Sequence, residues 1–246
     1  MIPLRDANPT RRRPVVTVGL IVACIAVFLY ELTVLSSGGD RGLARLFGDY
    51  GLVPAKLTGL LGGDQANELY RALFSVLSSM FLHADPLHIG FNMLFLWIFG
   101  NNIEDRLGHV GFLVFYLAGG VVAAVAQVVV DPSSSTPVIG ASGAVAAVLG
   151  AYLVLYPRAR VLSLVYFGLF FQLIQIPAIV LLGIWFVIQI GGAVMASGSS
   201  AAGGGVALFA HIGGFAAGVV VGLLVRANGA GGRPRPLRST DRVGVG

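Results

Sequence analysis

Four strongly polar residues lie inside long apolar stretches of the chain: His88, Asn92, Ser142 and His211. In a lipid environment such groups are costly and usually mark a functional site. A serine hydroxyl that reaches an imidazole can act as a nucleophile, because the imidazole takes its proton. His88 and Asn92 are four residues apart, a spacing that places both on one face of a helix. These residue types predict nucleophilic chemistry, provided that the fold brings Ser142 and His211 together.

The elements that must position these residues are membrane helices. Of the 246 residues, 56% are hydrophobic and only 11% are charged, and the mean hydropathy is +0.86. Soluble domains carry about 25% charged residues, so the composition excludes a cytosolic globular enzyme, a disordered chain and a disulfide-stapled secreted domain. The single cysteine, Cys24, cannot form an internal disulfide or a cysteine-based zinc site. We therefore predict an all-α polytopic membrane protein.

Six stretches are apolar over about the 20 residues, or slightly fewer, that a helix needs to cross the hydrocarbon core. The predicted spans are Val15–Leu35, Pro86–Asn101, Val110–Val130, Ala141–Tyr156, Ile176–Met195 and Val206–Val225. Asp85 is a typical N-cap residue, and Pro86 after it is typical of the first helical position. Together they predict the start of the second span. The apolar stretch Val161–Gln175 is interpreted as a lead-in to the fifth span, with a seventh crossing as the alternative.

Basic residues favour six spans over seven. With both termini cytoplasmic, the inner side carries four arginines of the N-terminal tail, five of the C-terminal tail, and Arg106, Arg158 and Arg160. Seven spans would separate the two basic tails. The expected organisation is a basic cytoplasmic tail (1–14), a six-span domain (15–226) and a disordered basic tail (227–246). The net charge of +5 then favours contact of the tails with anionic lipid headgroups rather than with nucleic acid.

The four polar residues lie at similar depth in this arrangement, near the outer side of the membrane. Within the domain, residues 36–85 form an outer loop predicted to hold short interfacial helices, with a plain solvated loop as the alternative. His211 is followed by Gly214, Gly218 and Gly222, and such small residues allow two membrane helices to approach closely. Close approach is what Ser142 needs to reach His211.

These residues resemble the motifs of the rhomboid intramembrane serine proteases. Gly140-Ala-Ser-Gly143 is similar to the GxSG motif, and Ala210-His-Ile-Gly-Gly214 is similar to the AHxxG of the last catalytic span. The segment from His83 to Asn92 fits the HxxxxHxxxN pattern, and Glu104-Asp-Arg106 resembles an ExR signature. The resemblance covers roughly Leu69 to Val225.

The resemblance implies a serine endopeptidase that cuts in or near transmembrane helices of single-span membrane proteins. Ser142 would be the nucleophile, and His211 would be the general base and then the acid. His88, Asn92 and the backbone amides of Ala141 and Ser142 would hold the oxyanion. The implied location is the plasma or inner membrane of the cell, with the site opening to the outer side.

Four further residues have structural roles under this resemblance. Gly140 would let the chain bend toward the nucleophile, and His83 would organise the loop above the site. Gly143 and Gly214 belong to the motifs around Ser142 and His211. One position departs from the pattern of some members, which carry an aromatic residue stacked on the histidine where this chain has Ala146.

The identity of the residue that orients the His211 imidazole is therefore left open, and Phe209 and Phe215 are candidates. No metal or cofactor is expected, because paired membrane aspartates and an HExxH pattern are both absent from the sequence. Two other classes stay open: a non-catalytic relative that binds membrane clients, and a small transporter or channel. The sequence does not indicate an oligomeric state.

Overall fold

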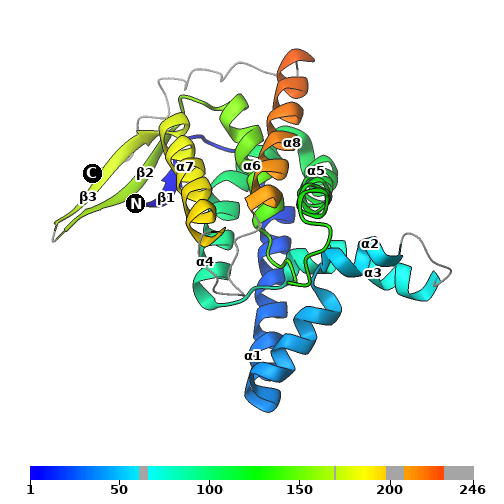
Figure 1. Cartoon of the computed structure of the whole chain (residues 1–246). Coiled ribbons are helices and arrows are strands. Elements are labelled where there is room, and N and C mark those ends of the chain that lie inside the picture. Colours follow the sequence, from blue (N-terminus) through cyan, green and yellow to red (C-terminus); the bar gives the residue numbers. More distant parts are fainter. Residues whose placement is uncertain (61–65, 169, 198–207, 230–246) are drawn as a thin grey trace, which may run out of the picture.

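The computed structural model describes residues 1–60, 66–168, 170–197 and 208–229 (Figure 1). The predicted disordered tail lies outside the described residues from position 230 onward. The helices are α1 (Val15–Tyr50), α2 (Pro54–Leu60), α3 (Ala66–Ser78), α4 (Pro86–Phe95), α5 (Asn101–Val130), α6 (Ser142–Leu155), α7 (Ala178–Ser197) and α8 (Leu208–Ala227). Two short turns complete them, the 3-10 turn η1 (Ser79–Phe81) and the π-helical turn η2 (Leu96–Gly100). The strands are β1 (Ile2–Asp6), β2 (Arg160–Phe167) and β3 (Phe170–Pro177).

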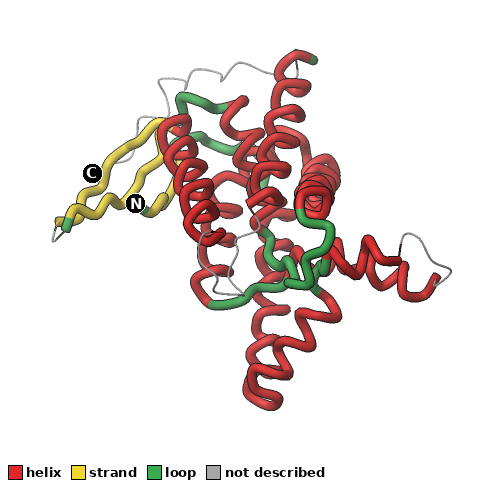
Figure 2. Tube along the Cα trace, viewed as in Figure 1, coloured by secondary structure: helices red, strands yellow, loops and turns green. Residues whose placement is uncertain are grey.

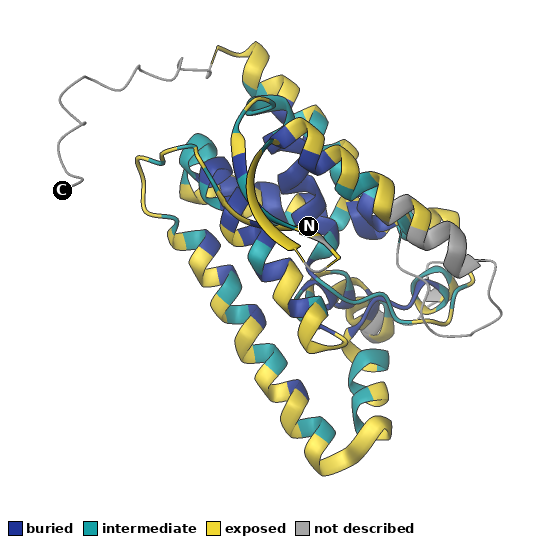
Figure 3. Cartoon of the chain, turned by 90° about the vertical axis from the view of Figure 1, so that its left-hand side faces the viewer, coloured by how far each residue is buried: buried dark blue, intermediate teal, exposed yellow. Residues whose placement is uncertain are grey.

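Helix α6 forms the centre of the bundle. Every residue from Gly143 to Tyr152 is buried, and the helix packs most extensively against α8 and then α5. Figure 3 shows buried residues gathered in this central region, whereas much of α1 presents exposed side chains. The fourth apolar stretch is thus enclosed by other helices, which explains why it can be apolar on every side.

Two long helices are broken at glycines with positive φ. Gly39 (φ 59°) divides α1, and the chain then turns back beside its own first part (Figures 1 and 3). Gly108 (φ 74°) divides α5 after its first two turns. Glycine adopts this left-handed region without the steric cost that other residues meet, so both breaks are encoded locally.

Three helical segments of the described chain are long and apolar enough to cross a membrane: Val15–Tyr50, Pro86–Val130 and Leu208–Ala227. The predicted fourth and fifth spans correspond to shorter apolar helices, Ser142–Leu155 and Ala178–Ile188. The fold is therefore a mostly helical membrane protein, and the count of six crossings stays a prediction. The predicted start of the second span is confirmed, since the Asp85 carboxylate accepts hydrogen bonds from the Leu87 and His88 amides at 2.9 Å.

The expectation of an all-α fold is wrong in one region. Residues predicted to lead into the fifth span instead form the antiparallel hairpin β2–β3, and β1 adds to its other edge in the order β1-β2-β3 (Figure 2). Leu164, Val165 and Tyr166 pair with Leu173, Gln172 and Phe171. Branched and aromatic side chains favour strands, and Gly168 (φ 62°) supplies the turn. A continuous apolar run does not distinguish a strand from a helix.

Candidate active site

Ser142 is the first residue of α6, at the end of a tight approach from the preceding loop. The Gly140 amide donates to the Ser79 carbonyl at 2.9 Å, and Gly140 has φ 122°. A Cβ at this position would lie only 2.7 Å from Nε2 of His88. Glycine is thus required at this position for two reasons: its backbone conformation is unfavourable for other residues, and a side chain would collide with the His88 ring.

His211, on the first turn of α8, meets Ser142 across the α6–α8 interface. Its Nε2 lies 2.7 Å from the Ser142 Oγ, and the residue is 6% exposed. A Cβ on Gly214 would collide with the carbonyl oxygen of Gly143, and one on Gly218 would collide with that of Ala147. The glycines therefore set the helix separation that makes the hydrogen bond possible.

An aromatic side chain from α7 lies next to His211, whereas Ala146 has no ring that could stack on the imidazole. The Trp185 ring lies 6.2 Å from the His211 imidazole, centroid to centroid, with an interplanar angle of 43°. The candidates suggested by the sequence do not fill this role: Phe215 stacks on Phe186 at 5.0 Å, and Phe209 is 40% exposed. Trp185 was not identified from the sequence, because it lies 26 positions before His211 with no motif to mark it.

The other nitrogen of His211, Nδ1, is buried and makes no hydrogen bond to any residue that the structure describes. A carboxylate at this position would form a Ser-His-Asp arrangement. The geometry among the described residues is that of a Ser-His pair. In the same residues no cluster of three His, Cys, Asp or Glu side chains is placed to hold a metal.

His88 and Asn92 come from one face of α4 and make different hydrogen bonds. The His88 Nδ1 accepts a long hydrogen bond of 3.4 Å from the Ala84 amide, which assigns the proton of the neutral ring to Nε2, the atom next to Gly140. The Asn92 Nδ2 donates to the His88 carbonyl at 2.8 Å. One N–H of this amide remains for another acceptor.

The His83 ring packs against the His88 ring. The two rings meet edge to face with centroids 5.2 Å apart, and the His83 Nδ1 lies 3.1 Å from the Phe81 carbonyl. Burial, and then the charge that His88 can carry, lower the pKa of His83 to about 4, so the ring is neutral near pH 7. Its backbone amide donates to the Glu31 carboxylate at 3.0 Å, which ties this loop to α1. Glu31, an acid inside an apolar helix, was a detectable signal that the sequence analysis missed.

The loop before Ser142 is held by the segment that follows α1. Leu52 and Val138 exchange backbone hydrogen bonds of 3.1 and 2.7 Å, and a Cβ at Gly51 would lie 2.9 Å from the Ile139 side chain. A cavity of about 30 Å³ adjoins Ser142 and is lined by residues of this loop and of α5, including Gly120. This is room for about one water molecule or slightly more.

Comparisons with known proteins place this site in a family. The Rhomboid domain profile matches residues 66–228, about two thirds of the chain. The chain belongs to the rhomboid family. It is 29% identical over 177 residues to Rhomboid protein 1, mitochondrial, of Saccharomyces cerevisiae, covering 68% of this chain and 46% of that protein. It is also 40% identical over 78 residues to Rhomboid protease GluP of Bacillus subtilis, covering 32% of this chain and 15% of that protein.

A third relative is Presenilin-associated rhomboid-like protein A, mitochondrial, of Danio rerio, 38% identical over 92 residues. That match covers 37% of this chain and 24% of the relative. The chain thus aligns with less than half the length of each of these relatives. The residues that match the Rhomboid domain profile include His88, Asn92, Ser142 and His211.

Glu104, in the first turn of α5, has a structural role. Glu104 is fully buried, and its carboxylate accepts from the Val16 and Thr17 amides and the Thr17 hydroxyl at 2.7–2.9 Å. His109 Nδ1 lies 2.6 Å from the same group. Glu104 therefore caps the first turn of α1, whose amides have no partner within the helix.

Proposed function

We propose that this rhomboid is an intramembrane serine endopeptidase. The observation that carries the proposal is the 2.7 Å approach of the Ser142 Oγ to the Nε2 of the buried His211. Membership of a family that includes a named rhomboid protease supports the same reading. The substrates would be single-span membrane proteins whose helices are locally unwound, because an intact helix hides its scissile carbonyl.

The proposed reaction begins when the Ser142 oxygen bonds to the carbonyl carbon and its proton moves to the His211 Nε2. The carbonyl oxygen becomes an oxyanion. The protonated His211 then donates to the leaving amine as the C–N bond breaks, which leaves an acyl ester on Ser142. Water, deprotonated by His211, cleaves the ester and restores the serine hydroxyl. The cavity beside Ser142 has room for that water.

We expect three kinds of donor to stabilise the oxyanion. The His88 Nε2–H lies beside Gly140, the Asn92 amide has one free N–H, and the first amides of α6, with that of Ala141 before them, lack helical acceptors. One such donor in a site without bulk water contributes about 3–4 kcal/mol to the transition state. Trp185 would act as a positioning residue that keeps the imidazole from rotating away.

The proposed topology has six crossings with both termini in the cytoplasm. The basic tails and the inner-loop arginines support it. We propose the plasma or inner membrane of the cell, with Ser142 opening to the outer side. Some relatives carry mitochondrial names. A reporter fused to the C-terminus tests directly on which side of the membrane that terminus lies. Exposure of that reporter on the outer side would contradict the proposal.

The activity is tested with purified protein in liposomes and a panel of single-span substrates. Ser142→Ala and His211→Ala are expected to abolish cleavage. Ser37→Ala and His109→Gln are the matched controls, since Ser37 is exposed on α1 and His109 contacts Glu104 rather than the site. Cleavage that survives Ser142→Ala would contradict the proposal. A wild type that captures the substrates without cutting any of them would favour the client-binding alternative.

A further inference from the structure

The hairpin β2–β3 exposes apolar side chains that no part of the described chain covers. Phe170 is 74% exposed, Phe171 66%, Leu173 62% and Tyr166 58%. Consecutive residues of a strand point to opposite faces, and every described residue of β3 except Ile176 is exposed, so both faces of this strand are uncovered. An exposed apolar surface of this kind marks contact with a membrane or a partner.

Charge is distributed unevenly between the two ends of the hairpin. No Asp, Glu, Lys or Arg occurs from Val161 to Pro177, whereas Arg158, Arg160 and, on β1, Arg5 lie at its root and are exposed. The acid at the root, Asp6, is already engaged by the Tyr152 hydroxyl and the Asn102 amide. Its burial raises the pKa. The root is therefore cationic and the tip apolar.

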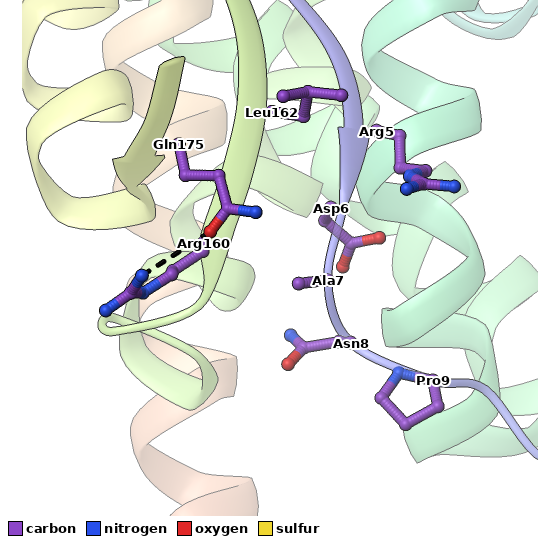
Figure 4. A pocket seen from close by; sticks show the side chains of 8 residues that line it. All are labelled: Arg5, Asp6, Ala7, Asn8, Pro9, Arg160, Leu162 and Gln175. Atoms are coloured by element: carbon purple, nitrogen blue, oxygen red, sulfur yellow. Dashed lines mark hydrogen bonds between the residues drawn. The ribbon is translucent and has the colours of Figure 1, made fainter. Parts of the chain in front are cut away.

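A cavity of about 390 Å³ opens at this cationic root. Its lining includes Arg5, Asp6 and Asn8 from the N-terminal segment, and Arg160 and Gln175 from the hairpin, with Arg5 and Arg160 on opposite sides (Figure 4). The Arg160 Nη1 donates to the Gln175 Oε1 in a long bond of 3.5 Å. Neither arginine pairs with a carboxylate in the described chain. Guanidinium groups without anionic partners are suited to a phosphate group.

The hairpin leaves the bundle at the end of α6 that lies opposite Ser142. β2 begins shortly after α6 ends, and β3 continues directly into α7, where the Ala178 amide donates to the Ala159 carbonyl at 2.8 Å. Its two strands extend outward beside α7 rather than over the helix ends (Figures 1 and 2). The tip thus points to the side of the bundle, where lipid surrounds a membrane protein.

We propose that the hairpin lies in the interface of the membrane leaflet opposite Ser142 and that the Arg5–Arg160 cavity binds the phosphate of an anionic phospholipid. Aromatic side chains such as Tyr166 favour this zone. The free backbone edge of β3 also belongs there, because headgroups and water satisfy amides that the hydrocarbon core cannot. The inference rests on the membrane location of the chain and goes beyond the proposed peptidase activity.

The position of the tip is tested in nanodiscs with an environment-sensitive dye on Phe170→Cys, in a Cys24→Ala background. We expect quenching by lipids spin-labelled near the headgroup and protection from aqueous iodide, with the reverse for the reference label Ser37→Cys. Quenching of the Phe170→Cys label by iodide alone would overturn the proposal. Protection from both quenchers, together with disulfide cross-links between two copies of the unlabelled Phe170→Cys variant, would also overturn it, since a second copy would then cover the hairpin.

The headgroup site is tested by the affinity for phosphatidylglycerol over phosphatidylcholine, measured by native mass spectrometry. The double substitution Arg5→Gln and Arg160→Gln is expected to weaken phosphatidylglycerol binding by about fivefold for each arginine. The charge-matched control is Arg41→Gln with Arg45→Gln on α1. Equal losses in both pairs would overturn the proposal, and so would displacement of the lipid by inorganic phosphate, which would identify a free-phosphate site. Melting midpoints of all variants establish that each is folded.

Discussion

At the scale of single residues, the account depends on how His211 is held. The Ser142 hydroxyl lies at its Nε2, the tilted Trp185 ring lies 6.2 Å from its imidazole between centroids, and its Nδ1 is unpaired among the described residues. In a Ser-His-Asp triad a carboxylate fixes the ring by its Nδ1. In this protein, packing of neighbouring side chains must fix the His211 ring instead. The residues that constrain the imidazole should therefore affect the rate more than substrate binding.

Trp185→Ala is expected to lower kcat by about threefold to tenfold with little change in KM. The loss corresponds to an aromatic contact worth about 0.5–1.5 kcal/mol. Trp185→Phe should recover most of the rate, because a ring is again available to face the imidazole. Cleavage kinetics in liposomes measure both, with Trp97→Ala as the control, since Trp97 is 51% exposed. A rise in KM alone would show that Trp185 binds substrate instead.

Gly140→Ala is expected to reduce kcat by about 100-fold, the effect of losing an oxyanion donor. A methyl group there would displace the His88 ring, and alanine disfavours φ 122°. Gly90→Ala is the matched control on the same helix as His88, because its Cβ would meet nothing within 4 Å. Equal activity of the two variants would contradict the role given to His88.

The stability of the protein should fall on acidification because of His83. Its pKa is about 4 in the folded protein and about 6.5 when unfolded. Between these values the unfolded chain binds more protons, so stability is lost as the pH falls through this window and is constant above it. Melting midpoints across the window measure the slope. His83→Gln should have a shallower slope than wild type, and an identical slope would assign the effect to other groups.

At the scale of elements, polar contacts at the start of α1 and near its middle hold this helix to the bundle. Glu104 receives three hydrogen bonds from Val16 and Thr17 at its start, and Glu31 receives the His83 amide further along. Both carboxylates are buried. Helix propensity alone does not place α1 against α4 and α5, so these polar contacts act together with the core packing of Leu20 and Cys24.

Glu104→Ala is expected to lower the free energy of unfolding by about 2–4 kcal/mol, since buried amides at Val16 and Thr17 lose their acceptor. Thr17→Val should cost less, because it removes one donor and leaves the carboxylate with others. The double variant should cost less than the sum of the two, which reports direct coupling. Denaturant titration in detergent micelles measures all three. Strict additivity would contradict the capping role.

At the scale of the whole molecule, the sequence predicts features that depend on regular spacing or on neighbouring residues. Apolar length located the helices, Asp85 and Pro86 marked a helix start, and the glycines after His211 anticipated its close packing on α6. The hairpin was missed because a strand and a helix share the same apolar composition in Val161–Gln175. Trp185 was missed for another reason: its neighbour is decided by tertiary packing across α7 and α8.

The most direct test of the central claim is covalent labelling by a fluorophosphonate, followed by mass spectrometry of the adduct. We expect the phosphonyl group on Ser142 alone in the wild type, and no adduct in His211→Ala, because the hydroxyl would lack its base. Labelling should survive in Ser37→Ala. An adduct on another residue, or undiminished labelling of His211→Ala, would contradict the Ser142–His211 assignment.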